Sequence, residues 1–448
     1  TAELGASWPK QVEPRFDERK AILLDDRWAS AREDLARIFY QQEDADQVSA
    51  ANFAGAGQAV ARQAAWYAQK ANESGKKEMA DLFSAIAAQA QETQQNPSDS
   101  QDSEDSQAFA FAKDVALVTG VSAKSIAGQV VAGLLRKGAS VVATSHSFST
   151  AFIQWAKQTY RQNASGSAKL WIVPANLSSY RDVDALASWI GSEQKETHGA
   201  DTTVIKPAYQ PTLLYPFAAP SMHGTLADSG QLFESQARLM LWGLERLIAK
   251  LGPLGTDTDV DHQLHVILPG SPNRGTLGGD GAYGEIKSAL DAIINRSRVE
   301  KDWSSNVTFA HPRIGWVRGT GLMGGNDPLV AAVEKHGVRT FSTEEISQKL
   351  LDLASEQSRQ EARKAPLDVD LTGGMGSVSL DMAALKQEAE EMAAETQTDA
   401  ASSAAASAAS ADPQASQTSD QSLIKALPTL HQAAQAQDDL SQWQGVTA

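Results

Sequence analysis

The chain lacks cysteine altogether, has few aromatic residues and contains no long apolar run. None of its 448 residues is cysteine, and aromatic residues make up 6%. The absence of cysteine excludes disulfides, cysteine-ligated zinc and thiol nucleophiles, and it suits a reducing compartment. No apolar stretch approaches the roughly 20 residues of a membrane-spanning helix, and no signal-peptide pattern opens the chain. The sequence therefore predicts a cytoplasmic protein without a metal centre.

Positive charge is scarce as well. The formal net charge is -16 at pH 7. A surface that follows nucleic-acid phosphates or an anionic membrane would have to work against that field, so neither is an expected partner. Part of the acidic excess lies in "SDSQDSEDS" (98–106), which has almost nothing to bury.

Composition divides the chain into four parts. Residues 1–92 place apolar residues at three- and four-residue steps, which predicts a helical N-terminal segment. Residues 93–108 are expected to be an acidic linker, and residues 377–448 a helical and low-complexity tail. Residues 109–376 alternate apolar runs with helical patterns, which predicts an α/β, Rossmann-like doubly wound parallel sheet. The strands are expected at 114–119, 140–145, 169–174, 212–217, 263–269 and 307–317.

The first predicted βαβ unit lacks glycines that a dinucleotide-binding turn usually has. In "DVALVTGVSAKSIAGQVVAGLLRKGASVVATS" (114–145), a strand, turn, helix and strand follow each other within the roughly thirty residues of such a unit. Gly120 lies at the turn, and Ser125 is predicted to cap the helix end where a pyrophosphate binds. Lys124 and Ala127 stand where glycines are usual. This stretch alone leaves nucleotide binding and an ordinary βαβ unit equally open.

Three side chains fit the reduction of a ketone. Of seven tyrosines, only Tyr283 has a basic residue four positions later, and helical periodicity puts it one turn from Lys287. Ser271 ends the apolar strand of "LHVILPGS", at the sheet edge where ligands bind. A Lys287 ammonium would lower the pKa of the Tyr283 phenol, which would donate a proton, while Ser271 would hold the carbonyl oxygen. The hydride must come from a cofactor.

These motifs resemble a known family. "LVTGVSAKSIAGQVVAGLLRKGASVVATS", "LHVILPGSPNRG" and "GAYGEIKSALDAII" resemble the short-chain dehydrogenase/reductase superfamily. "LWIVPANLSSYRDVDAL", "LPGSPNRGTLGGDGAYGEIKSALDAI" and "IGWVRGTGLMGGND" resemble the β-ketoacyl reductase region of type I fatty acid synthases, the bacterial single-chain kind in particular. The resemblance covers about residues 109–375, and "FDERKAILLDDRWASAREDLAR" is similar to the segment that precedes the reductase. We therefore expect a reductase region excised from a larger chain.

The resemblance implies an NADPH-dependent 3-oxoacyl-[acyl-carrier-protein] reductase with Ser271, Tyr283 and Lys287 as catalytic residues. Its substrate would be a β-ketoacyl thioester on the phosphopantetheine arm of an acyl carrier protein. Its other partners would be the remaining domains of a homo-oligomeric fatty acid synthase. The implied cofactor-binding residues are Gly120, Ser122, Lys124, Ser125 and Ile126 at the turn, Ser145 and His146 after the second strand, Asn176 and Leu177 beside the adenine, Phe217 and Ala218 beside the ribose, and Gly315.

The second strand ends in "ATSHS" (143–147), which has no Asp or Glu to bind a free ribose 2′-hydroxyl. This disfavours NAD and leaves room for the 2′-phosphate of NADPH. Lys124, Ser145 and His146 are the groups assigned to that phosphate, since the arginine of many relatives is absent. His146 as an exposed loop residue is the alternative.

Two other functions stay open. Many superfamily members carry an asparagine in the helix before the serine strand, but "ARLMLWGLERLIAK" has none, and Trp242-Gly243 stands in its place. An inactive structural module of a synthase is therefore one alternative. Enoyl-thioester reduction is the other, because some enoyl reductases share the Ser-Ile-Ala turn, although they space Tyr and Lys more widely.

Overall fold

The computed structural model describes residues 7–26, 31–40, 49–53, 56, 58–91, 109–198, 201–220, 222–275, 278–320, 324–378 and 380–394. None of the helices within these ranges is both long and apolar enough to cross a membrane. The chain forms two compact units, Thr1–Met382 and Ala383–Ala448. The described part of the second unit, 383–394, is helical.

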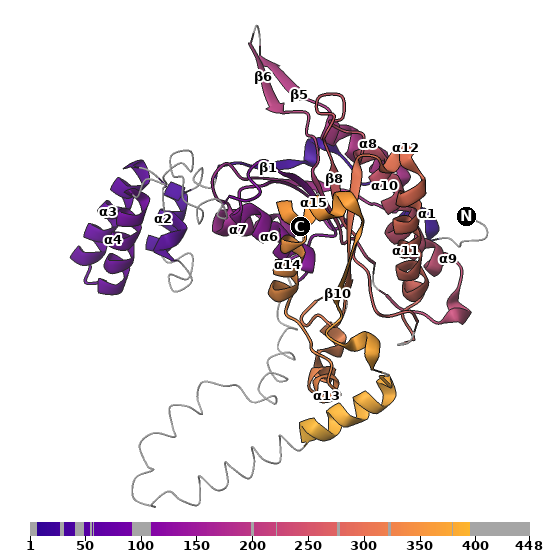
Figure 1. The fold of residues 1–448 in the computed structure, drawn as a ribbon. Coiled ribbons are helices and arrows are strands. Elements are labelled where there is room, and N and C mark those ends of the chain that lie inside the picture. The colour runs from indigo at the N-terminus through magenta and orange to yellow at the C-terminus, as the bar shows by residue number, and fades with distance from the viewer. Residues whose placement is uncertain are drawn as a thin grey trace, which may run out of the picture. The chain divides into compact units, whose positions relative to one another are not determined.

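An eight-stranded sheet lies at the centre of the first unit (Figure 1), in the order β1-β4-β3-β2-β7-β8-β9-β10. β1 runs antiparallel to β4, and every other neighbouring pair is parallel. From β2 the chain builds outward to β4 and then returns to β7, which creates a switch point between β2 and β7. The strands are β1 (Ile22–Leu24), β2 (Val115–Thr119), β3 (Ser140–Ser145), β4 (Lys169–Pro174), β7 (Leu213–Pro216), β8 (Leu264–Ile267), β9 (Val307–Ile314) and β10 (Leu367–Leu371). The predicted Rossmann-like α/β fold is confirmed.

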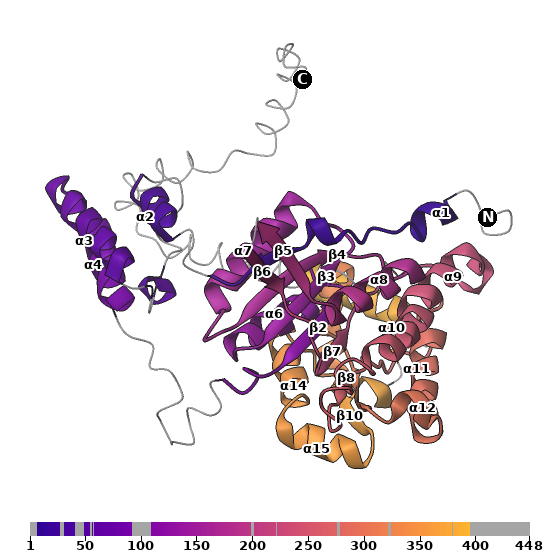
Figure 2. The ribbon, with the colours of Figure 1, turned by 90° about the horizontal axis from the view of Figure 1, so that it is seen from above.

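Helices cover both faces of the sheet (Figure 2). Because successive side chains of a strand point to opposite faces, β2 sends Ala116 and Val118 into one core and Leu117 into the other. The first core is covered by α6 (Ile126–Arg136), α7 (Thr150–Asn163) and α14 (Thr343–Asp352), and the second by α8 (Tyr180–Gly191), α10 (Gly243–Leu251) and α11 (Tyr283–Val299). Burial on both faces explains why these strands read as continuous apolar runs in the sequence.

Shorter elements complete the sheet domain. They are the hairpin β5 (Gln194–His198) and β6 (Asp201–Lys206), the helices α9 (Gln231–Ala237), α12 (Lys301–Ser304), α13 (Val330–Lys335) and α15 (Glu356–Lys364), the π-helix η6 (Arg238–Trp242), and the 3-10 turns η5 (Leu226–Asp228), η7 (Gly324–Leu329) and η8 (Met375–Ser377). A buried ion pair ties α15 to the start of β2, because both Arg359 Nη atoms lie 2.7 Å from the carboxylate oxygens of Asp114.

The first ninety residues form two different structures. Three helices and a 3-10 turn share their own apolar core, namely α2 (Ala31–Phe39), η3 (Ala50–Phe53), α3 (Gln58–Glu73) and α4 (Lys77–Gln91). Residues 7–26, here called the N-terminal strap, hold α1 (Trp8–Gln11), η1 (Glu18–Lys20) and β1. Within the predicted helical segment 1–92, residues 22–24 form a strand that pairs with β4. Three apolar residues are too few for periodicity to distinguish strand from helix. The predicted linker 93–108 and the tail beyond residue 394 lie outside the described residues.

Candidate active site

Ser271, Tyr283 and Lys287 meet beyond the carboxyl end of β8. Tyr283 is the first residue of α11, and the Nζ atom of Lys287 lies 5.4 Å from the centre of its ring. Lys287 is buried and donates a hydrogen bond to the Pro269 carbonyl at 2.6 Å. Ser271 is buried too, and its hydroxyl accepts a hydrogen bond from Asn273 N at 3.1 Å and acts to lower the pKa of Tyr283. The structure therefore brings together the three side chains that the sequence selected.

Burial dominates the ionisation of this group. It raises the pKa of the Tyr283 phenol; the hydrogen bond with Ser271 opposes that rise, and the charge of Asp280 adds to it. Burial also lowers the pKa of Lys287 to about 8. The net pKa of Tyr283 is therefore raised, because burial disfavours the phenolate, and the lowering of this pKa by Lys287 stays a prediction. The phenol stays protonated at neutral pH, the form in which it can donate a proton.

A buried glutamine supports the start of α11. Gln236, on α9, is 0% exposed, and its Oε1 accepts a hydrogen bond from the Ala282 backbone at 2.8 Å. Its Nε2 has no hydrogen-bond partner among the described residues. Gly281 has a φ of +62°, and a Cβ there would lie 2.6 Å from Gln236 Oε1. Sequence reasoning missed Gln236 because it searched this helix for an asparagine; a buried polar residue in the same helix was the available signal.

Trp242 and Gly243, at the position where an asparagine was expected, differ in their surroundings. Trp242 is 40% exposed, so its ring does not fill the site beside Tyr283. Gly243 packs its backbone closely, since a Cβ there would lie 2.5 Å from the Leu177 carbonyl oxygen. The predicted cofactor residue Leu177 is thus buried beneath the start of α10.

The turn after β2 lies in backbone contact with the loop after β7. Gly120 has a φ of +70°, and a Cβ on it would lie 2.6 Å from the backbone of Phe217 and Ala218. Ala218 also donates its N–H to Thr119 Oγ1 at 3.2 Å. Only glycine fits this turn. Three of the predicted cofactor residues therefore adjoin at the switch point between β2 and β7.

Ser125 caps α6, as predicted. Its hydroxyl accepts hydrogen bonds from Gly128 N and Ser122 N at 3.0 Å and donates to Ser122 O at 2.8 Å. Its only proton is therefore used inside the turn, so a direct bond from Ser125 to a pyrophosphate would require that bond to break. Gly128, the last residue of the "SAKSIAG" turn, has a packing reason to be glycine, since a Cβ there would overlap Ser122 O. Lys124 is exposed and Ile126, the first residue of α6, is half-buried.

The loop after β4 holds the N-terminal strap. The Asn176 side-chain amide donates to Gln11 O at 2.8 Å and Glu13 O at 2.9 Å. The buried Asp182 carboxylate accepts from the backbone N–H groups of Arg15, Phe16 and Asn176 through one oxygen, at 2.7 to 2.9 Å. The Asn176 amide is thus committed to the strap, and its place beside an adenine stays a prediction from its position.

The strap also supplies the arginine that the β3 end lacks. Ser145 is buried and donates to Ser147 O at 3.1 Å, while His146 is exposed. Arg15 Nη1 donates to the His146 carbonyl at 3.1 Å, although the two residues are 131 positions apart. Partial desolvation of the His146 ring, and then the Arg15 charge, lower the pKa of this exposed residue. An arginine absent from the local sequence is therefore present in space.

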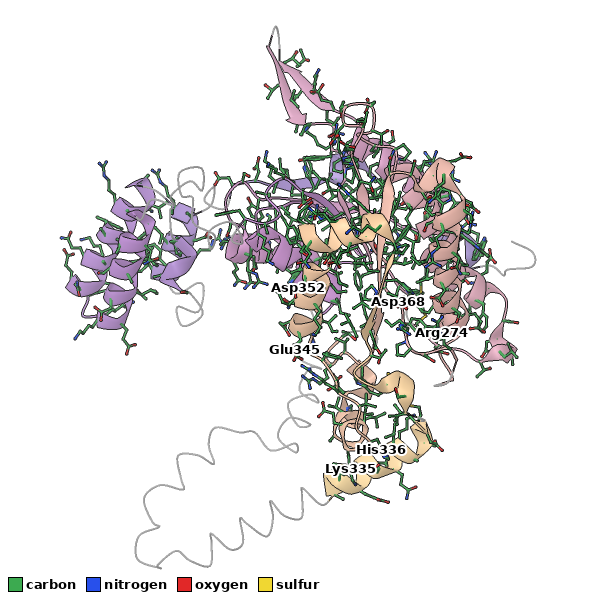
Figure 3. All side chains as sticks on the ribbon, in the orientation of Figure 1. Arg274, Lys335, His336, Glu345, Asp352 and Asp368 are labelled. Atoms are coloured by element: carbon green, nitrogen blue, oxygen red, sulfur yellow. The ribbon has the colours of Figure 1, made fainter. Side chains whose placement is uncertain are left out.

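Gly315 has a packing reason to be glycine. A Cβ there would overlap Thr372 O, and its N–H donates to Leu371 O at 3.0 Å, where β9 and β10 end. Its cofactor role stays a prediction. Nearby, Arg274 (Figure 3) follows β8 and contacts Asp291 on α11, with 2.9 Å between Nη2 and Oδ2. That ion pair joins the loop carrying Ser271 to the helix carrying Lys287.

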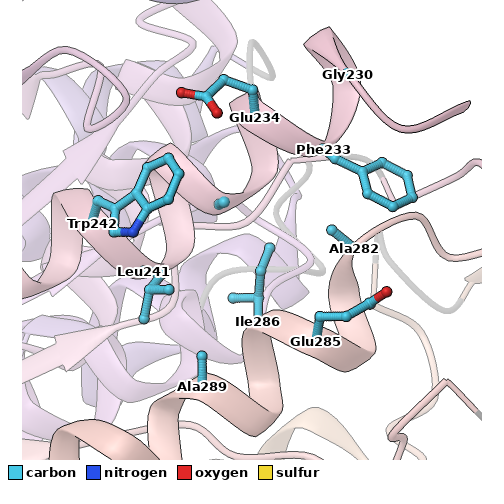
Figure 4. A pocket seen from close by; sticks show the side chains of 10 residues that line it. Gly230, Phe233, Glu234, Leu241, Trp242, Ala282, Glu285, Ile286 and Ala289 are labelled. Atoms are coloured by element: carbon cyan, nitrogen blue, oxygen red, sulfur yellow. The ribbon is translucent and has the colours of Figure 1, made fainter. Parts of the chain in front are cut away.

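A cavity of about 450 Å³ lies between α9, η6 and α11 (Figure 4). Glu285, Ile286 and Ala289 line it from that helix. Ala282 and Ile286 of this lining form one apolar cluster with Met240, and Tyr283 packs against the same cluster. The cavity therefore lies beside the residues that surround Tyr283.

The chain is similar in sequence to fatty acid synthases. It is 36% identical over 291 residues to a fatty acid synthase subunit alpha of Emericella nidulans, covering 64% of this chain and 16% of that one. The identity to the subunit alpha of Candida albicans is 37% over 268 residues, 59% of this chain and 14% of the relative. Fatty acid synthase apf5 of Gibberella fujikuroi is 33% identical over 288 residues, which cover 64% of this chain and 17% of that one. The chain thus spans about one-sixth of the length of these relatives. They confirm the predicted relation to a fatty acid synthase; the bacterial single-chain kind stays a prediction.

No family model matches the chain. Among solved structures, L-sorbose reductase from Gluconobacter frateurii, complexed with NADPH and L-sorbose, aligns with a TM-score of 0.48 and 17% identity over 60% of this chain and 99% of that one. The RhlG/NADP complex of Pseudomonas aeruginosa aligns with a TM-score of 0.48 and 22% identity over 60% of this chain and 99% of that one.

Proposed function

We propose that this chain carries the β-ketoacyl reductase of a fatty acid synthase, and that it reduces a β-ketoacyl thioester to the β-hydroxyacyl thioester with NADPH. The observation that carries the proposal is the meeting of Ser271, Tyr283 and Lys287 at the sheet edge that also holds the Gly120 turn. The similarity to fatty acid synthase α subunits supports it. The reductase domain is proposed to be residues 109–376 together with the strap.

The residues at the switch point fit a dinucleotide. Gly120 admits no Cβ, so its backbone can approach a phosphate closely, and α6 starts beside it with eleven helical residues. No carboxylate follows β3 in "ATSHS", which fits a 2′-phosphorylated ribose. Gly120, Ile126, Phe217 and Ala218 would hold the cofactor. NADPH, when bound, supplies the hydride for the carbonyl carbon.

The chain's own side chains supply the proton and hold the carbonyl oxygen. Ser271 would donate a hydrogen bond to that oxygen and stabilise the charge that develops on it. Tyr283, kept protonated by burial, would donate its proton to the same oxygen. Lys287 is an ammonium below about pH 8, one helical turn away, and would stabilise the phenolate that remains. The Pro269 carbonyl fixes the position of that ammonium.

We propose that the substrate arrives on the phosphopantetheine arm of an acyl carrier protein, within a cytoplasmic, homo-oligomeric synthase. Attachment to the same assembly would raise the effective substrate concentration into the millimolar range. The isolated chain is then expected to bind free substrate weakly, so assays need a high substrate concentration or a loaded carrier.

The test is NADPH oxidation by the full chain with acetoacetyl-CoA, and with crotonyl-CoA as the enoyl control. Tyr283→Phe is expected to lower kcat/KM for the keto substrate about a hundredfold to ten-thousandfold, because it removes the proton donor. Tyr40→Phe is the matched control, since Tyr40 is 65% exposed on a distant segment of the sequence. Reduction of crotonyl-CoA alone would favour an enoyl reductase. If the chain reduces neither substrate, even on a carrier protein, the proposed reductase function is wrong. The remaining alternative is then an inactive structural module of a synthase.

A further inference from the structure

We propose that Arg15, on the N-terminal strap, binds the 2′-phosphate of NADPH and makes the site prefer NADPH over NADH. This inference rests on the proposed function. It assigns cofactor specificity to a residue that lies 131 positions before its neighbour at the end of β3. The specificity group would thus come from outside the βαβ unit that holds the rest of the dinucleotide.

The first argument is location. Arg15 Nη1 donates to the carbonyl oxygen of His146, the residue directly after β3. In doubly wound folds the end of the second strand of the unit faces the adenosine ribose, where an acidic residue selects NAD and a nearby arginine accommodates the 2′-phosphate of NADP. Here β3 is that strand, and no acidic residue follows it in "ATSHS". Arg15 therefore occupies the position that decides between the two cofactors.

The second argument is that the arginine is held in place while its charge stays available. The Arg15 backbone N–H is fixed to the buried Asp182 carboxylate at 2.7 Å, and Asn176 fixes the strap just before it. The Arg15 side chain is exposed, and no carboxylate pairs with it among the described residues. A guanidinium has five N–H donors, and the bond to His146 uses one of them. The others can form the paired bonds that arginine makes with phosphate.

The third argument is charge. The chain carries a formal net charge of -16, so a doubly charged phosphate needs a local cation to bind. His146 is a poor candidate, because partial desolvation of its ring and the neighbouring Arg15 lower its pKa and favour the neutral imidazole. The Ser145 hydroxyl donates its proton in a hydrogen bond to Ser147 O. Of the residues that the structure places at the end of β3, Arg15 is the group that carries a permanent positive charge.

The experiment measures equilibrium binding of NADPH and NADH to the full chain by nucleotide fluorescence, with adenosine 2′,5′-bisphosphate and 5′-ADP as competitors. Arg15→Ala is expected to raise the Kd for NADPH about tenfold to a hundredfold, because hydrogen bonds to charged groups are lost, and to change the Kd for NADH by less than about twofold. The tighter binding of the 2′,5′-bisphosphate over 5′-ADP should shrink by the same factor. Arg15→Lys should restore part of the preference.

The matched control is Arg19→Ala, a strap residue whose guanidinium pairs with Asp17 at 3.0 Å instead of facing β3. It should leave both Kd values unchanged. Thermal unfolding of each variant shows whether the fold is kept. If Arg15→Ala keeps the NADPH preference, or weakens NADPH and NADH equally, the inference is wrong even if wild type reduces acetoacetyl-CoA. If wild type binds neither dinucleotide, the proposed function fails and this inference fails with it.

Discussion

The two halves of the carboxyl edge of the sheet are built in different ways. Beyond β8, three side chains from one stretch of sequence, Ser271 to Lys287, form the proton-donating group. Beyond β2, β3, β4 and β7, the groups come from five separate stretches and act mainly through backbone, as in the close contact of Gly120 with Ala218. A catalytic group formed by side chains at helical spacing can be predicted from a local sequence pattern. A binding surface formed by backbone contacts between distant segments cannot be predicted in this way.

The largest expected effect concerns Lys287, in the proton-donating group beyond β8. Because burial lowers its pKa to about 8, Lys287 is charged below that pH and neutral above it. The kcat/KM for ketone reduction should therefore fall as pH rises through about 8 in wild type. Lys287→Met should lower kcat/KM at neutral pH about a hundredfold to a thousandfold and remove that pH step. Lys287→Arg should move the fall to higher pH. A wild-type profile that is flat between pH 7 and 9 would contradict this role.

The next effect tests the β2–β4 half through Asp182. Its carboxylate holds three backbone N–H groups, two of them in the strap. Asp182→Ala should lower the free energy of unfolding by about 3 kcal/mol, because a buried charged acceptor is lost, and raise the Kd for NADPH about tenfold by releasing Arg15. Chemical denaturation and nucleotide fluorescence measure the two quantities.

Asp184→Ala is the control for Asp182→Ala. Asp184 lies two residues later and pairs with Arg246 at 2.7 Å at the surface, so its loss should cost less than about 1 kcal/mol. If the two substitutions have equal effects, the contacts of Asp182 with the strap do not account for the loss of stability and of NADPH binding.

The smallest expected effect tests how the β8 half is held in place. Gln236→Ala removes the hydrogen bond to Ala282 N, which is worth about 1 kcal/mol, and should lower kcat/KM about fivefold through a displaced Tyr283. The Kd for NADPH should stay the same, in contrast to Asp182→Ala. Gln357→Ala, at an exposed position of α15, is the control. A parallel loss of NADPH binding would mean that Gln236 supports both halves.

Buried apolar strands were the most predictable part of the fold. The predicted bounds of 140–145 and 169–174 coincide with β3 and β4, whose central residues are buried on both faces. β10 was missed because "LDVDL" alternates apolar residues with exposed aspartates; Asp368 contacts Arg313 of β9, with 3.3 Å between Oδ1 and Nε. The hairpin β5–β6 was missed for a similar reason, since residues 195–197 and 202–205 are exposed.

In the candidate site, spacing predicted which side chains meet but not their ionisation. Tyr283 and Lys287 lie four residues apart, which fixes their shared face in any α-helix. The pKa of each depends on burial and on neighbours such as Asp280, which only the folded chain defines. Arg15 could not be predicted, because no local pattern links residue 15 to residue 146.

The short strand β1 has a consequence for how the reductase can be isolated. It pairs with β4 along Leu170, Trp171 and Ile172, and so replaces β4 as the edge strand on that side of the sheet. A chain that began at residue 109 would leave this apolar strand with a free edge, a template for pairing with other molecules. Such a fragment is expected to aggregate in light-scattering measurements, whereas one that keeps residues 7–26 should stay monodisperse. The smallest independent reductase is therefore discontinuous along the sequence.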